Sequence, residues 1–355
     1  MIDDKYFCRE HIDQLRERYG GDPALHEKCI HAFALLAHLS ATGIDFVFKG
    51  GSSLLLHVEP IRRLSIDIDV MSHAGAEQLN AVVDTIAQAA PFIRWEEDQR
   101  GSRGLPMRRH FKLFFKSLVS QQESYVILDV VEEDQCNLAT ELKEIDFAFF
   151  KTASTCQVKV LTVDALLGDK LTAFAPNTVG VPYVTDKGRS MTMQVVKQLF
   201  DIGVLFDVAQ DFDAVRKAFA ASYELEKTYR DQEHSREDVL NDIISTGLGI
   251  CGFHLRGVPK FEHLPKIQDG VQRLQNHLLI DPFKMDRGAK IAASKAVLLA
   301  SALKQGIAID FETYTAAPAQ IDRLRDAQLP AAMAQYARLK QILPDAFHYL
   351  SKVTA

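Results

Sequence analysis

The sequence has no long hydrophobic run. None of its apolar stretches reaches the roughly 18 residues that a membrane-spanning helix needs, which argues against a transmembrane protein. It has no H-E-x-x-H or other histidine spacing typical of a metal site, no internal repeat and no low-complexity tract. Residues 1–20 are charged and helical in pattern, so a secretory segment is not expected there.

Cysteines are few, and basic residues are not in excess. The five cysteines are scattered without a C-x-x-C pair, which predicts a reduced, cytoplasmic protein. Against 47 acidic residues stand 41 Lys and Arg, so the net charge of −6 argues against general affinity for nucleic acid or membranes. A local basic patch can still bind a polyanion. With 355 residues, 47% of them hydrophobic, the chain can bury two domain cores.

The first part of the chain has the pattern of an α/β domain. Apolar residues at helical spacing predict three longer helices, over residues 7–20, 23–42 and 75–90. Short apolar or alternating runs predict four strands, over residues 44–48, 64–71, 110–118 and 124–133. With a short helix after the first strand, the order is β-α-β-α-β-β. We therefore expect an α+β fold with a small mixed sheet and helices packed on it.

The second part of the chain is helical in pattern. Helices are predicted over 161–176 and 192–209, separated by a loop rich in Gly and Pro. From there to the end no convincing strand is visible. The change of pattern predicts two domains, residues 1–160 and 161–355.

The run "KGGSSLLLH" places two glycines between a strand and a short apolar helix. Glycines such as Gly50 and Gly51 let the backbone approach a phosphate chain without a Cβ clash. Ser52 stands where a helix N-cap is expected. Free N–H groups and the positive dipole end of the helix would then face the phosphates.

Acidic residues stand inside an apolar strand pattern. Period-two geometry places Asp67 and Asp69 on one face of "SIDIDV", and a later strand offers Asp129. Two such carboxylates can bridge Mg²⁺ ions, while the third completes a second metal site or accepts a proton from a nucleophile. Another D-x-D, Asp211 and Asp213, lies in a polar context and is expected to begin the next helix.

These motifs resemble the AbiEii/AbiGii nucleotidyltransferase toxins of the polymerase-β-like superfamily. The matching pattern is G-G-[ST] followed by R-x-S-x-D-[IL]-D, here Gly50, Gly51, Ser52, Arg63, Ser65, Asp67 and Asp69. The resemblance implies an N-terminal polymerase-β-like domain and a C-terminal helical domain that completes the nucleotide site. It places Ser65 at that site; a small polar filler is the alternative. A phosphate added to Ser65 would crowd the carboxylates, which is a hypothesis of regulation.

Two later motifs extend the resemblance. "VDALLGDKLTAF" places the family's nucleotide-binding lysine at Lys170, although Gly168 stands where alanine is common. "KQLFDIGVLF" places the last acidic motif at Asp201, with Lys197 and Gln198 instead of the usual Arg-Asp. Asp201 is assigned either a catalytic role or a salt bridge, for example to Lys170.

The resemblance implies Mg²⁺-dependent transfer of a nucleoside monophosphate from an NTP, with two metal ions. The implied acceptor is the 3′ end of tRNA, and the implied role is the toxin of a bacterial toxin–antitoxin or abortive-infection system, with a cognate antitoxin. One alternative is transfer to a small molecule or a protein side chain. Another is a catalytically silent binding module. Candidate RNA contacts are Arg108, Arg109, Lys112, Lys187 and Arg189.

Overall fold

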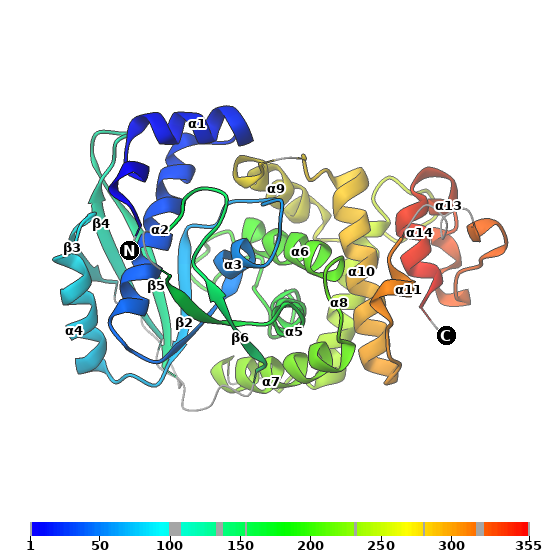
Figure 1. The fold of residues 1–355 in the computed structure, drawn as a ribbon. Helices are drawn as coiled ribbons and strands as arrows, with labels where there is room; N and C mark the ends of the chain where they lie inside the picture. The colour runs from blue at the N-terminus through cyan, green and yellow to red at the C-terminus, as the bar shows by residue number, and fades with distance from the viewer. Residues whose placement is uncertain are drawn as a thin grey trace. The chain divides into compact units, whose positions relative to one another are not determined.

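The computed structural model describes residues 2–98, 108–132, 138–152, 155–230, 233–279, 281–316 and 323–353 (Figure 1). The chain divides into two compact units. The first, here called the sheet unit, comprises Met1–Thr162 and Asn276–Asp281. The second, the helical unit, comprises Val163–Gln275 and Pro282–Ala355.

The sheet unit contains a seven-stranded mixed sheet in the order β3-β4-β5-β2-β1-β7-β6. Two neighbouring pairs, β2 with β5 and β1 with β7, are parallel, and the other pairs are antiparallel. The strands are β1 (Phe46–Lys49), β2 (Asp67–Ser72), β3 (Phe92–Glu97), β4 (Arg108–Lys116), β5 (Glu123–Glu132), β6 (Thr140–Glu144) and β7 (Gln157–Leu161). The predicted mixed sheet is confirmed, but it is larger than expected.

Three strands, β3, β6 and β7, are not predicted by the sequence patterns. β3 and β6 form the two edges of the sheet, and β6 keeps no side chain fully buried. β7 has only five residues. Short strands and edge strands need few apolar side chains, so their period-two signal is weak.

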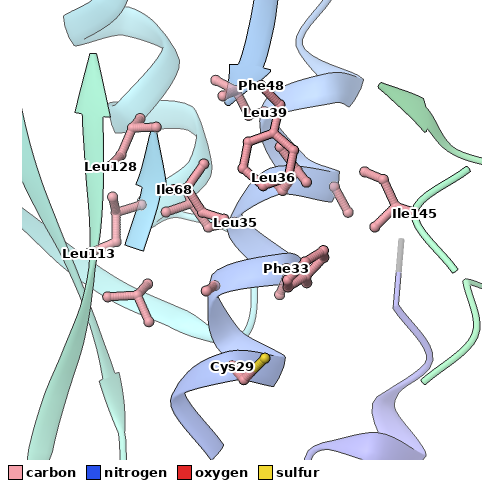
Figure 2. Packing of buried hydrophobic residues seen from close by; sticks show 14 of the residues in the cluster. Cys29, Phe33, Leu35, Leu36, Leu39, Phe48, Ile68, Leu113, Leu128 and Ile145 are labelled. Atoms are coloured by element: carbon pink, nitrogen blue, oxygen red, sulfur yellow. The ribbon is translucent and has the colours of Figure 1, made fainter. Parts of the chain in front are cut away.

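One face of the sheet packs against helices and forms the core. The helices of this unit are α1 (Arg9–Tyr19), α2 (Pro23–Ala41), α3 (Gly50–Ser53) and α4 (Ala76–Ala87), with short 3₁₀ turns at Asp4–Tyr6 and Leu54–Leu56. Helix α2 lies against β2 and β5, and α4 against β3 and β4. Figure 2 shows Leu35 of α2 beside Ile68 of β2, on the side of the helix that faces Leu113 and Leu128. We call this side of the sheet the core face.

A segment from late in the chain belongs to the sheet unit. Within Asn276–Asp281, Leu278 forms an antiparallel bridge with Arg63. The backbone N–H of Leu64 donates to the carbonyl of His277 at 2.7 Å, and that of Leu279 to Arg62 at 3.1 Å. These bonds hold the backbone directly before β2.

The regular elements among the described residues of the helical unit are all helical. They are α5 (Val163–Ala173), α6 (Thr192–Phe206), α7 (Phe212–Arg230), α8 (Arg236–Cys251), α9 (Leu264–Leu274), α10 (Lys290–Gln305), α11 (Phe311–Tyr314), α13 (Leu339–Ile342) and α14 (Pro344–Ser351), with shorter turns at Met285–Ala289, Arg323–Asp326 and Ala331–Tyr336. A further short turn, Gln275–His277, spans the boundary between the two units. Asp211 Oδ1 accepts hydrogen bonds from the N–H groups of Asp213 and Ala214 at the start of α7. The prediction that this D-x-D begins a helix is confirmed.

Arg109 lies on the core face, so its prediction as an RNA contact is wrong. Its side chain is 8% exposed, and its guanidinium donates to both carboxylate oxygens of Glu97 at 2.8 and 2.9 Å. It also donates to Asn80 Oδ1 and to the carbonyl of Ala76, both on α4. In a strand, consecutive side chains point to opposite faces, so Arg108 is exposed while Arg109 pins α4 to the sheet.

Replacing Arg109 with Ala should lower the free energy of unfolding by about 2–4 kcal/mol, because the partners of a buried cation lose their donor. The matched control is Arg108→Ala, which should change it by no more than about 0.5 kcal/mol. Urea unfolding followed by fluorescence measures this in the sheet unit, because the single tryptophan, Trp95, lies in β3.

The ion pair between Arg109 and Glu97 makes the stability of the fold depend on pH. Hydrogen bonds from Arg109 hold the pKa of Glu97 below its usual 4.5. A lowered folded-state pKa means that the stabilisation is present above pH 4.5 and is lost as pH falls through the folded-state pKa. The gap between wild type and Arg109→Ala should therefore shrink in acid; a gap of constant size down to about pH 3 would contradict the ion pair.

Candidate active site

Three carboxylates lie on the sheet face opposite the core, which we call the acidic face. On β2, Asp67 and Asp69 are partly buried, whereas Ile68 between them is fully buried. The parallel register of β2 and β5 places Asp69 beside Asp129 and Asp67 beside Ile127. Directly opposed residues in a sheet share a face, so the three carboxylates lie on the same side. The predicted alternation along β2 and β5 is confirmed.

His110 joins this group, and the sequence reasoning missed it. It lies on β4 directly opposite Asp129, and its Nδ1 is 2.5 Å from Asp129 Oδ1. The alternation in "HFKLFFKSL" places His110 on the polar face of its strand. Which residue of β5 it meets depends on the β4–β5 register, which the sequence pattern does not give.

The glycine turn packs directly on the carboxylates. Gly50 has a φ of +77°, and a Cβ added to it would lie 2.0 Å from Asp69 Oδ2. A Cβ on Gly51 would lie 2.4 Å from a guanidinium nitrogen of Arg63 and 3.1 Å from the hydroxyl of Ser65. Glycine is needed at position 50 both for its backbone angle and for the close approach. The turn and the acidic strand therefore form one packed group.

Ser52 does not cap the helix as predicted. Helix α3 begins at Gly50, and Lys49 is its N-cap residue, without a side-chain capping bond. Ser52 lies inside the helix, fully buried, and its hydroxyl donates to the carbonyl of Asp67 at 2.5 Å. Ser52 therefore ties α3 to the start of β2.

Two polar residues shortly before β2, Arg63 and Ser65, are buried. The strand begins at Asp67, three residues later than predicted, so Ser65 precedes it. Ser65 is 8% and Arg63 5% exposed, and Arg63 Nη1 donates to the carbonyl of Leu64 at 3.1 Å. The Arg63 guanidinium thus packs against the glycine turn at Gly51. The assignment of Ser65 to the nucleotide site stays a prediction.

Lys170 and Asp201 form an ion pair inside the helical unit. Lys170 Nζ, on α5, lies 3.9 Å from Asp201 Oδ2, on α6. Their side chains are 7% and 0% exposed. The salt bridge, one of the two alternatives for Asp201, is confirmed. Whether either residue meets a nucleotide stays a prediction.

The remaining candidate RNA contacts are divided between the two units. Arg108 and Lys112 are on the same side of β4 as His110, and Lys112 Nζ lies 3.2 Å from Asp98. Lys187 and Arg189 are exposed in a turn of the helical unit, which an isolated bridge between Val184 and Ser190 closes.

The acidic face offers donors that suit a magnesium ion. Carboxylate oxygens are the ligands that Mg²⁺ prefers, and a site for it commonly needs one or two carboxylates besides phosphate and water oxygens. In the part of the chain that the structure describes, no three acidic, histidine or cysteine side chains already have the arrangement of a metal site. The metal role of Asp67, Asp69 and Asp129 therefore stays a prediction that the donor chemistry favours.

Gly50→Ala should weaken binding of Mn²⁺, used as a probe for Mg²⁺, by roughly 10-fold or more, because the added methyl group displaces the Asp69 carboxylate. Gly43→Ala is the matched control: Gly43 also has a positive φ, +75°, but its added Cβ meets nothing within 4 Å. Electron paramagnetic resonance of each variant titrated with Mn²⁺ measures the affinity. Equal effects would show that backbone strain alone is responsible.

Comparison with known proteins supplies the family. A family model described as "Nucleotidyl transferase AbiEii toxin, Type IV TA system" matches residues 34–290, more than half of the chain. No curated protein matches the chain. Within the described residues, no helix has the length and apolar character needed to cross a membrane.

Solved structures show only distant likeness. JHP933 from Helicobacter pylori is 12% identical, with a TM-score of 0.41 over 85% of this chain and 94% of that chain. An antigenic nucleotidyltransferase-like protein from Paracoccidioides brasiliensis is 14% identical, with a TM-score of 0.36 over 59% of this chain and 91% of that chain.

The family match extends from α2 to the start of α10 and includes both the glycine turn and the acidic strand. It confirms the resemblance drawn from those motifs and identifies the chain as a nucleotidyltransferase. The chain belongs to the AbiEii family of nucleotidyltransferase toxins of type IV toxin–antitoxin systems.

Proposed function

We propose that this protein transfers a nucleoside monophosphate from an NTP to an RNA acceptor, the 3′ end of a tRNA, in a Mg²⁺-dependent reaction in the cytoplasm. The observation that carries the proposal is the placement of Asp67, Asp69 and Asp129 on one face of the sheet, with Gly50 packed on Asp69. Blocking the 3′ end of a tRNA would stop translation, and this would explain why the enzyme acts as a toxin.

The three carboxylates are assigned the metal chemistry. Asp67 and Asp69 hold the ions, and Asp129 acts either as a further ligand or as the base toward the acceptor hydroxyl. Bound Mg²⁺ would supply charge stabilisation for the attacking and leaving oxygens of an in-line displacement. The glycine turn is assigned to position the triphosphate and Asp129 to position the acceptor hydroxyl; such positioning is, with charge stabilisation, the main source of rate in these transfers.

The nucleotide is assigned to the glycine turn. The N–H groups at Gly51 and Ser52, at the start of α3, are suited to phosphate oxygens. The hydroxyl of Ser52 is committed to Asp67, so the turn contributes its backbone and not that side chain. Lys170 is assigned to charge neutralisation on the triphosphate, and Asp201 to holding the lysine.

The acceptor is assigned to the acidic face beyond the carboxylates. Tyr125 on β5 is 37% exposed, and the ammonium groups of Lys28 and Lys112 lie 5.0 and 5.3 Å from its ring centre. Exposed aromatic rings with nearby cations are typical of surfaces that bind single-stranded nucleic acid. Tyr125 is four residues before Asp129, about 13 Å along the strand.

Two other functions would use the same fold. Transfer to a small molecule or a protein side chain would need the acidic face but not the basic residues beyond it. A silent binding module would need neither carboxylates nor metal. The family also implies a cognate antitoxin.

Activity is tested by incubating the protein with Mg²⁺, each labelled NTP in turn, and total RNA. Label should appear on RNA of tRNA size and should fall by at least about 100-fold in Asp67→Asn, which removes one metal-binding charge and keeps the shape. Asp213→Asn, from the D-x-D that begins α7, is the matched control and should retain activity. Label on protein or on small molecules instead of RNA would contradict the assigned acceptor.

Acceptor binding is tested separately. Replacing Arg108 and Lys112 with Gln should weaken tRNA binding by roughly 5- to 30-fold and lower its salt dependence by about one to two phosphate contacts. The control pair Arg216→Gln and Lys217→Gln removes the same charge from exposed positions on α7. If both pairs weaken binding equally, net charge and not this surface determines the affinity.

A further inference from the structure

Four residues form a row straight across the acidic face. Lys49 of β1 pairs with Asp69 of β2, Asp69 with Asp129 of β5, and Asp129 with His110 of β4. Directly opposed side chains in a sheet lie about 4.5–5.5 Å apart at Cβ. His110 is therefore the next side chain beyond Asp129 in the row that contains the carboxylates.

The contact between His110 and Asp129 is short and partly shielded from water. Nδ1 and Oδ1 are 2.5 Å apart, and the side chains are 18% and 30% exposed. A hydrogen bond to a carboxylate at this distance is among the stronger kinds in proteins. An ionised carboxylate can only accept a hydrogen bond, so a bond at this position requires the His110 tautomer that carries its proton on Nδ1.

This bond opposes a local repulsion. Asp69 and Asp129 stand side by side on parallel strands, and two adjacent carboxylates repel each other until a cation lies between them. The hydrogen bond from His110 restrains the Asp129 side chain against this repulsion. The donor at position 110 fixes one of its oxygens on the far side and leaves the other for the site.

We infer that His110 is the positioning residue of this active site: its Nδ1–H fixes the Asp129 carboxylate in the orientation that serves the cation or the acceptor hydroxyl. The inference rests on the proposed role of Asp129. His110 lies one strand farther from Asp69 than Asp129 does, so it acts through Asp129 and not on the substrate. Partners that orient metal-binding groups in this way typically contribute 10- to 100-fold to metal affinity or activity.

Three variants of the full chain test the role of the donor. His110→Leu keeps most of the volume and removes the hydrogen bond. His110→Asn places an amide N–H near the position of Nδ1, whereas His110→Gln places it near Nε2. His73→Leu, at an exposed histidine just after β2, controls for the loss of a surface histidine.

The first measurement is Mn²⁺ affinity by electron paramagnetic resonance, which needs neither NTP nor acceptor. Affinity should fall by roughly 10- to 100-fold in His110→Leu and in His110→Gln and recover most of that loss in His110→Asn. The second is labelling of total tRNA at varied NTP concentration: kcat should fall in the same order, with the KM for NTP unchanged. Thermal unfolding of the variants shows whether the fold is kept.

Wild-type affinity and kcat in His110→Leu would overturn the inference. So would an Asn variant as impaired as the Leu variant at equal thermal stability, because the imidazole itself and not the donated hydrogen bond would then be required. Asp67→Asn separates the two claims. If Asp67→Asn loses Mn²⁺ binding and activity while His110→Leu keeps both, only the role of His110 fails; if Asp67→Asn also keeps both, the proposed function fails.

Discussion

The in-register parallel pairing of β2 with β5 is the constraint on which the rest of the sheet unit depends. It places Asp69 beside Asp129, and it is held by the core on the other face, where Ile68 and Leu128 pack under α2. A slip of one residue would turn the carboxylates into the core and the apolar side chains to the acidic face. The free energy of apolar burial therefore also fixes the positions of the acidic groups.

The glycine turn and the segment before β2 are built onto that pairing. Gly50 approaches Asp69 because it has no Cβ, and Ser52 ties α3 to the carbonyl of Asp67. The bridge between Arg63 and Leu278 holds the chain just before the strand. Chain segments far apart in sequence thus converge on the residues around Asp67.

Sequence patterns predicted the residues of the acidic strand well, because alternation is a local property. The pattern predicts Asp67 and Asp69 on one face of their strand and offers Asp129 from a later strand, and the family match confirms the enzyme class. The salt bridge between Lys170 and Asp201 was one of two stated alternatives, since two charged residues on apolar helices need partners.

Other features depend on contacts that the sequence does not display. Arg109 reads as one more cation of a basic segment, but α4 and Glu97 surround it on the core face. In the sequence, His110 is an ordinary polar residue of a strand. Only the register between β4 and β5 shows that it lies opposite Asp129. Ser52 fits the composition of an N-cap, but the helix begins two residues earlier, at Gly50.

The most direct test of the account is a crystal structure of the protein with Mn²⁺ and a non-hydrolysable NTP analogue, with the metal located by anomalous scattering. The expected result is manganese bound by Asp67 and Asp69, with the triphosphate against the turn at Gly50 and Gly51. Nucleotide and metal bound elsewhere, with the three carboxylates uninvolved, would contradict it.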